Sequence, residues 1–76
     1  MDKNSRLKLC FCKAFNLQID YDYEKLSYLK YVYWDSITHM VLISEIEEEF
    51  SVSLTTDDII AMDSFVQALN IVSKYS

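Results

Sequence analysis

The feature that most limits the fold of this chain is the absence of both glycine and proline from its 76 residues. Tight β-turns depend on these residues, because glycine supplies positive φ and proline a fixed φ. An all-β fold needs many such turns, whereas helices joined by irregular loops need few. With 51% hydrophobic and 25% charged residues, the chain has the composition of a globular domain. We therefore expect a single all-α domain over residues 1–76.

Three segments repeat their apolar residues at helical spacing, and a shorter one carries helix-start signals. The expected helices are residues 4–16, 36–50, 55–62 and 64–75. Each is expected to begin at a polar cap: Asn4 or Ser5, Asp35, Thr55 or Thr56, and Ser64, which forms a capping box with Gln67. The sequence thus predicts a small four-helix bundle of three main helices and one short helix.

The predicted core consists of the apolar side chains on the inner faces of these helices. Its members are Leu7, Phe11, Ala14, Ile43, Ile46, Phe50, Leu54, Ile59, Leu69 and Val72. Met40 and Leu42 are expected to extend the buried stripe of the helix over residues 36–50. Phe65, Ala68 and Tyr75 are expected to face inward from the last helix.

Residues 17–35 are rich in tyrosine and have no clear apolar period. We expect a long first loop with one helical turn, ordered by its own aromatic rings against the helices. The alternative is a short helix capped by Asp22, with Leu26, Leu29 and Tyr33 on one side.

Charge is distributed unevenly along the chain, whose formal net charge is −5. Residues 1–33 hold six lysines and arginines against four acids, whereas residues 34–76 hold Lys74 alone against eight acids. An acidic second half repels phosphate backbones, so nucleic acid is not an expected partner. A basic protein surface is the partner that this charge favours.

Signals for membrane insertion, secretion and metal binding are missing. No apolar run approaches the roughly 20 residues of a membrane span and no signal-peptide core is present, so a cytoplasmic protein is expected. Cys10 and Cys12 are then expected to be free thiols. Two cysteines and one histidine are too few ligands for a zinc site.

The stretch YWDSITHM, residues 33–40, holds the main candidate site. Ser36 could simply be a helix-start residue after Asp35. A hydrolytic site of Asp35, Ser36 and His39 is disfavoured, because so short a chain has little room for a cleft and an oxyanion hole; His39 is expected to be a partly buried packing residue. A third possibility is a phosphate-linked group on Ser36 Oγ, since first-turn amides and the helix dipole favour an anion.

The wider segment WDSITHMVLISEIEEEFSVSLTTDDIIAMDSF resembles the second half of an acyl carrier protein. Asp35, Ser36 and Ile37 correspond to the Asp-Ser-aliphatic motif of that family, and EIEEEF to the end of its acidic helix. TTDDIIAM and SFVQALNIVSKY correspond to its short third helix and its final helix. The resemblance covers residues 34–75 well, whereas residues 1–33 match only as a first helix and a long loop.

The resemblance implies a 4'-phosphopantetheine arm on Ser36, attached from coenzyme A by a phosphopantetheinyl transferase with magnesium. The arm's thiol would hold an acyl or aminoacyl group as a thioester, so the chain would be a monomeric carrier and not an enzyme. Its partners would be the transferase and acyl-transferring or acyl-activating enzymes with basic docking patches. By position, the docking residues would be Asp35, Ile37, Val41, Ser44, Glu47 and Glu48.

The sequence also departs from the family pattern. Thr38 and Val41 stand where carriers of fatty acid synthesis usually have acids, and Trp34 stands where a glycine is usual. The Trp-Asp-Ser-x-x-His-Met pattern is more similar to stand-alone carriers of accessory pathways. The alternative function is a small helical adaptor that binds a basic protein surface and is never modified.

Overall fold

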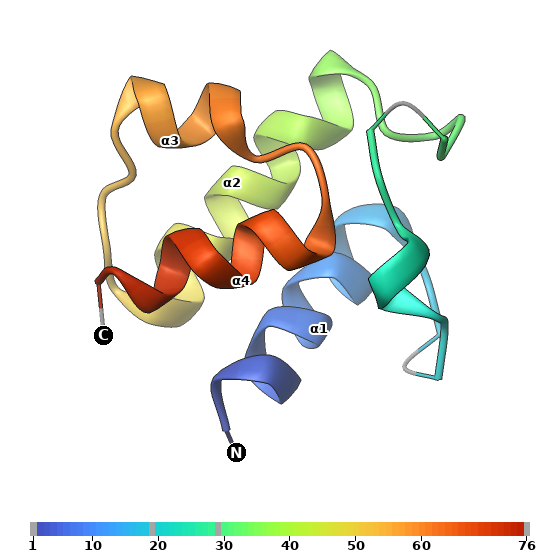
Figure 1. Cartoon of the computed structure of the whole chain (residues 1–76), viewed down its shortest axis with the longest axis horizontal. Helices are drawn as coiled ribbons and strands as arrows, with labels where there is room; N and C mark the ends of the chain where they lie inside the picture. Colours follow the sequence, from blue (N-terminus) through green and yellow to red (C-terminus); the bar gives the residue numbers. More distant parts are fainter. Residues whose placement is uncertain (1, 19, 29, 76) are drawn as a thin grey trace.

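The computed structural model describes residues 2–18, 20–28 and 30–75. Its elements are α1 (Lys3–Phe15), the 3₁₀ turn η1 (Tyr23–Lys25), α2 (Ser36–Phe50), α3 (Thr56–Ala61) and α4 (Phe65–Ser73). The described residues form four α-helices and no β-strand, which confirms the small all-α bundle. Figure 1 shows α4 crossing in front of α2, α3 at the upper left, and the long α1–α2 connection at the right.

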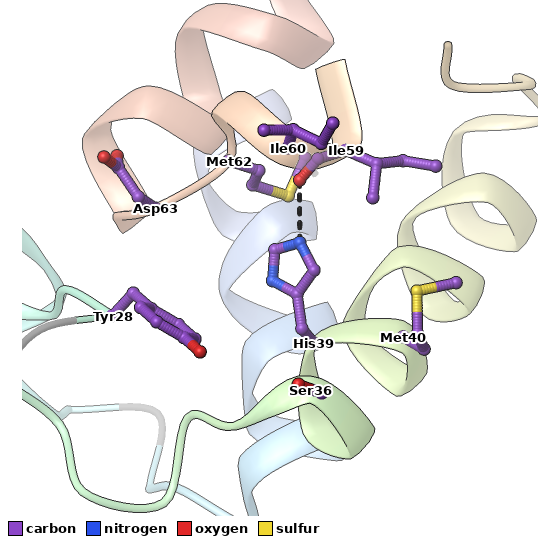
Figure 2. A pocket seen from close by; sticks show the side chains of 8 residues that line it. All are labelled: Tyr28, Ser36, His39, Met40, Ile59, Ile60, Met62 and Asp63. Atoms are coloured by element: carbon purple, nitrogen blue, oxygen red, sulfur yellow. Dashed lines mark hydrogen bonds between the residues drawn. The ribbon is translucent and has the colours of Figure 1, made fainter. Parts of the chain in front are cut away.

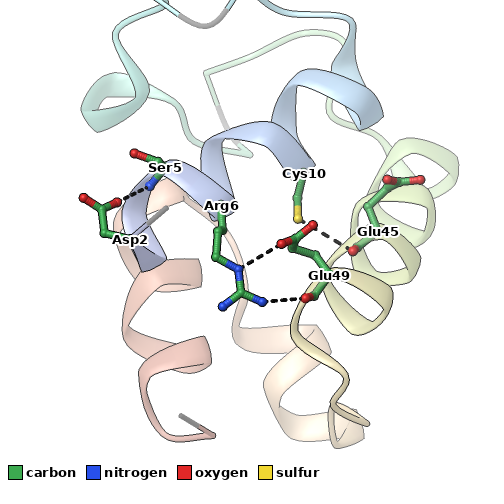
Figure 3. A network of polar contacts seen from close by, with 6 residues as sticks. All are labelled: Asp2, Ser5, Arg6, Cys10, Glu45 and Glu49. Carbon is green, nitrogen blue, oxygen red and sulfur yellow. Dashed lines mark hydrogen bonds and ion pairs between the residues drawn. The ribbon is translucent and has the colours of Figure 1, made fainter.

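α1 and α2 form the most extensive helix pair of the bundle. Figure 3 shows the polar contacts that cross this pair. Arg6 donates from Nε to Glu49 Oε2 at 2.9 Å and from its terminal nitrogen to the Glu49 carbonyl oxygen at 2.6 Å. The Cys10 thiol donates to the carbonyl oxygen of Glu45, with Sγ 3.6 Å from that oxygen. These contacts fix how α1 sits along α2.

The core agrees with the sequence pattern at most positions. Six predicted members are buried: Leu7, Phe11, Ile43, Ile46, Leu54 and Val72. Four are partly buried and pack against the core: Ala14, Phe50, Ile59 and Leu69. Met40 was wrongly placed in it, because its side chain is 54% exposed at the gap between α2 and α3. Cys10 and Phe15, which share the apolar spacing of the first expected helix, are buried as well. The pattern missed five buried side chains: Tyr23, Leu26, Trp34, Met62 and Ile71.

Aromatic rings organise the long α1–α2 connection, as expected. The ring of Phe11 lies 5.7 Å from that of Trp34 and 6.3 Å from that of Tyr23, both edge-on. Two backbone hydrogen bonds then tie the connection to the start of α4, from Tyr28 to Asp63 at 2.8 Å and from Phe65 to Leu26 at 3.2 Å. The single 3₁₀ turn η1 confirms the expected ordered loop with one helical turn and not the alternative short helix. Leu29, which the alternative placed on that helix, lies outside the described residues.

At two helix ends the chain uses other residues in the left-handed conformation that usually favours glycine. α1 and α2 both end in a left-handed residue, which is Asn16 (φ 57°) in one case and Ser51 (φ 55°) in the other. This conformation normally favours glycine, and asparagine tolerates it better than other residues. The two connections therefore use side chains that carry a steric cost, which is larger for serine.

Side chains cap the helix starts, but not always the predicted ones. α1 is capped by Asp2, whose carboxylate accepts from the Ser5 amide at 2.7 Å, so the prediction of Asn4 or Ser5 was wrong. Thr55 caps α3, and Ser64 caps α4 as predicted, with its Oγ accepting from the Gln67 amide at 3.0 Å. This bond is the only half of the predicted capping box among the described contacts. α4 ends at Ser73, two residues before the expected boundary.

α3 is held to the C-terminal end of the chain by a buried carboxylate. Asp58 accepts hydrogen bonds from Lys74 Nζ and from the Tyr75 hydroxyl, with its side chain almost completely buried. The bond from Lys74 and then that from Tyr75 hold the pKa of Asp58 down to about 2. None of the described helices has the length and apolarity that crossing a membrane requires.

Candidate functional site

The start of α2 is fixed by Asp35, which takes the capping role that the sequence predicted. One oxygen of its carboxylate accepts from the amides of Ile37 and Thr38, each at 3.0 Å. In return the Asp35 amide donates to Thr38 Oγ1 at 2.8 Å, which completes a capping box. These hydrogen bonds, of which those with Thr38 have the largest effect, hold the pKa of the Asp35 carboxyl below its usual value. The first turn of α2 is therefore rigid and carries a charged carboxylate.

Ser36 is the first residue of α2, and its side chain is exposed. Its hydroxyl makes no hydrogen bond with any of the residues that the structure describes. Because Asp35 already occupies the amides of Ile37 and Thr38, a phosphate on Ser36 would not be bound by those two amides. The helix start thus presents the hydroxyl to other molecules but does not by itself form an anion site.

A pocket of about 310 Å³ opens beside Ser36, between the start of α2 and α3 (Figure 2). Its lining is mostly apolar and comes from the α1–α2 connection, α2, α3 and the α3–α4 connection: Tyr28, Ser36, His39, Met40, Ile59, Ile60, Met62 and Asp63. Met40 and Ile60 are largely exposed at its edge, whereas Met62 is fully buried. An apolar group attached near Ser36 therefore has a place to lie.

His39 and Trp34 stand between this pocket and the core. The Trp34 indole is buried and stacks on the imidazole, with ring centres 6.0 Å apart. Its Nε1–H donates to His39 Nδ1 at 2.9 Å, and His39 Nε2 lies 2.7 Å from the carbonyl oxygen of Ile59. The imidazole is partly buried, as predicted, but it also makes a specific link between α2 and α3. Ser36 Oγ is not among the hydrogen-bond partners of His39 in the described part of the chain.

The predicted docking residues lie on one side of α2, but they do not form a uniformly free surface. Ile37 is 77% exposed and Val41 42%, and Ser44 and Glu48 are exposed as well. A shallow groove along this face is lined by Ser36, Ile37, Met40, Val41, Ser44 and Glu45. The face that continues from Ser36 is therefore more apolar than charged.

Glu47 was wrongly grouped with the exposed acids. Its side chain is partly buried, and its carboxylate accepts from the Leu54 amide at 2.8 Å, which holds the connection between α2 and α3. The neighbouring acids Glu45 and Glu49 form ion pairs with α1, to Lys13 at 3.9 Å and Arg6 at 2.9 Å. Of the four glutamates on α2, only Glu48 makes no ion pair or hydrogen bond with the described part of the chain.

The two cysteines take part in packing and hydrogen bonds inside the fold. Burial, and then the nearby Glu49 and Glu45, raise the pKa of the Cys10 thiol to about 12, so this thiol is unreactive. Cys12 Sγ lies 2.9 Å from the Tyr23 hydroxyl, which donates to the Gln18 carbonyl oxygen. Both cysteines are free thiols, as predicted. Over residues 2–18, 20–28 and 30–75, no three His, Cys, Asp or Glu side chains converge as a metal site would require.

Sequence reasoning missed three contributors to this region. Thr38 completes the capping box, and the Asp-x-x-Thr spacing could have indicated it. Tyr28 and Met62 line the pocket, but they come from separate connections, and no spacing in the sequence brings them to Ser36.

Comparison of the chain with protein-family models, with curated proteins and with solved structures finds no match.

Proposed function

We propose that this chain is a carrier protein that holds an acyl or aminoacyl group as a thioester on a 4'-phosphopantetheine arm attached to Ser36. The observation that carries the proposal is the division of roles at the start of α2. Asp35 supplies the cap, so the exposed Ser36 hydroxyl has no structural task among the described contacts. A serine needed only for helix formation would itself be expected to cap.

The attachment reaction fits this geometry. The transferase removes the proton from Ser36 Oγ, an Oγ–P bond forms, and the pyrophosphate bond of coenzyme A breaks to release adenosine 3',5'-bisphosphate. The rigid first turn holds Oγ outward, and the adjacent apolar pocket offers a surface for the aliphatic part of the arm or its cargo. The chain itself needs no catalytic group for this step.

The proposed docking surface is the exposed face around Ser36. Ile37, Val41 and Ser44 form its centre, and Asp35 and Glu48 provide charge at its edge. Glu47 is left out, because its carboxylate holds Leu54. Partner enzymes with an apolar contact area and a small number of basic residues fit this surface. The proposed carrier serves a pathway apart from main fatty acid synthesis, as the residues around Ser36 suggest.

Intact-mass measurement tests the attachment. The protein is incubated with coenzyme A, magnesium and a broad-specificity phosphopantetheinyl transferase, and we expect the mass gain of one phosphopantetheine group. Ser36→Ala should abolish the gain, whereas Ser53→Ala, at an exposed serine outside the proposed docking surface, should leave it intact. No gain in the unaltered protein would contradict the proposal and favour the unmodified adaptor.

A further inference from the structure

The only histidine and the only tryptophan of the chain are hydrogen-bonded to each other at the inner side of the pocket. Figure 2 shows the His39 ring reaching from α2 toward α3, with its bond to the Ile59 carbonyl oxygen dashed. Trp34 lies on the other side of the ring, in the segment that leads into Ser36. Three parts of the chain therefore meet at one imidazole.

The direction of these hydrogen bonds follows from the chemistry of the indole. An indole nitrogen can only donate, so His39 Nδ1 must accept and must carry no proton. The neutral imidazole then carries its proton on Nε2, which donates to the Ile59 carbonyl oxygen at 2.7 Å. Trp34 thus selects the tautomer that allows His39 to bind α3.

The acceptor of this bond lies where α3 needs a partner. Ile59 is among the last four residues of α3 (Thr56–Ala61), whose carbonyl groups have no intrahelical donor. A helix of six residues depends on tertiary contacts for its stability. Ile59 and Ile60 of this helix form the pocket wall that faces Ser36. The position of α3 therefore sets the width of the pocket.

We propose that His39 is a positioning residue that clasps α3 to α2 and holds the pocket beside Ser36 at its observed width. Trp34 sets the donor direction of the clasp, and the Ile59 carbonyl oxygen receives it. Loss of the clasp loosens α3 from α2, while Asp58 still holds it to Lys74 and Tyr75, and widens the pocket, so that larger apolar groups enter it. This proposal goes beyond the carrier function and holds for the unmodified chain.

Two substitutions at His39 test the two hydrogen bonds of its imidazole one at a time. His39→Gln keeps a donor near the position of Nε2, and His39→Asn keeps only an acceptor near that of Nδ1. Amide hydrogen exchange by NMR should show about tenfold faster exchange over residues 59–62 in His39→Asn, with little change in His39→Gln. Binding of the apolar dye 1-anilinonaphthalene-8-sulfonate should rise only in His39→Asn.

The amides of Ile43 and Ile46, on the core face of α2, serve as the internal control and should exchange at unaltered rates in both variants. Equal exchange over residues 59–62 in the two variants would overturn the clasp. Faster exchange in every helix would also overturn it, because His39 would then support the whole fold and not α3 in particular.

Discussion

The two neighbours of α2 are attached to it in different ways. On the α1 side, buried aliphatic residues meet and are flanked by the Arg6–Glu49 ion pair and the Cys10 thiol bond. On the α3 side, a cavity of about 310 Å³ separates the two helices, and the link from His39 to the Ile59 carbonyl oxygen crosses beside it. Ser36 lies on the α3 side.

The difference indicates which part of the molecule can adapt to a bound group. A close-packed helix pair has little room for rearrangement, because every displacement creates voids or clashes. A short helix held by a few polar contacts opens at a much lower free-energy cost. We therefore expect α1 and α2 to act as the rigid base and α3 as the movable wall of the pocket.

The largest expected effect comes from removing a ring on the rigid side. Phe11→Ala should lower the free energy of unfolding by about 3–5 kcal/mol, because Phe11 is fully buried and meets the rings of Trp34 and Phe65. Ile60→Ala, on the exposed edge of the pocket, should change it by less than about 0.5 kcal/mol. Urea denaturation measures both, and equal losses would remove the distinction between the two sides.

Acid should loosen the attachment of α3 to Lys74 and Tyr75, because it protonates the Asp58 carboxylate that binds them. The pKa of Asp58 is about 2 in the folded chain against an ordinary 3.8, so its stabilising contribution is complete above the ordinary value. The contribution is lost as the pH falls through about 2. Asp58→Asn should reduce the fall in thermal stability over this range, and the adjacent, exposed Asp57→Asn should not. The same acid response in both variants would contradict the role of Asp58.

A smaller effect is expected from the polar contacts on the α1 side. Arg6→Ala should cost about 1 kcal/mol, since Arg6 makes two hydrogen bonds to Glu49 and lies 4.6 Å from the centre of the Phe50 ring. Lys13→Ala is the matched control, because its ion pair with Glu45 is long and exposed and should contribute less than about 0.5 kcal/mol. If the two variants lose the same stability, the side chain of Arg6 does not help to fix α1 on α2.

The smallest expected effect concerns the steric cost of a residue other than glycine in the left-handed conformation. Ser51→Gly should raise the free energy of unfolding by about 0.5–1 kcal/mol, because Ser51 has φ 55° at the end of α2. Asn16→Gly should raise the free energy of unfolding by less, since asparagine tolerates the left-handed conformation better than serine. A gain at Asn16 as large as that at Ser51 would show that the benefit is not specific to serine.

Local patterns predicted the helices and much of the core, and their failures share one cause. Asp35, Thr55 and Ser64 were found as caps because a cap acts within three residues of itself. Met40 has the spacing of a core residue, yet the neighbour that would have covered it, α3, is held away across the pocket. Glu47 has the spacing of a surface acid, yet the chain turns back and brings the Leu54 amide to it.

Composition, periodicity and caps act over a few residues, so the sequence alone indicated an all-α chain, the position of α2 and the release of Ser36 from capping. The resemblance to acyl carrier proteins also rests on the order of segments along the chain. The link from His39 to α3, the choice of its tautomer by Trp34 and the pocket beside Ser36 became visible in the folded chain. These features join side chains from separate connections, and their meeting depends on how the helices pack.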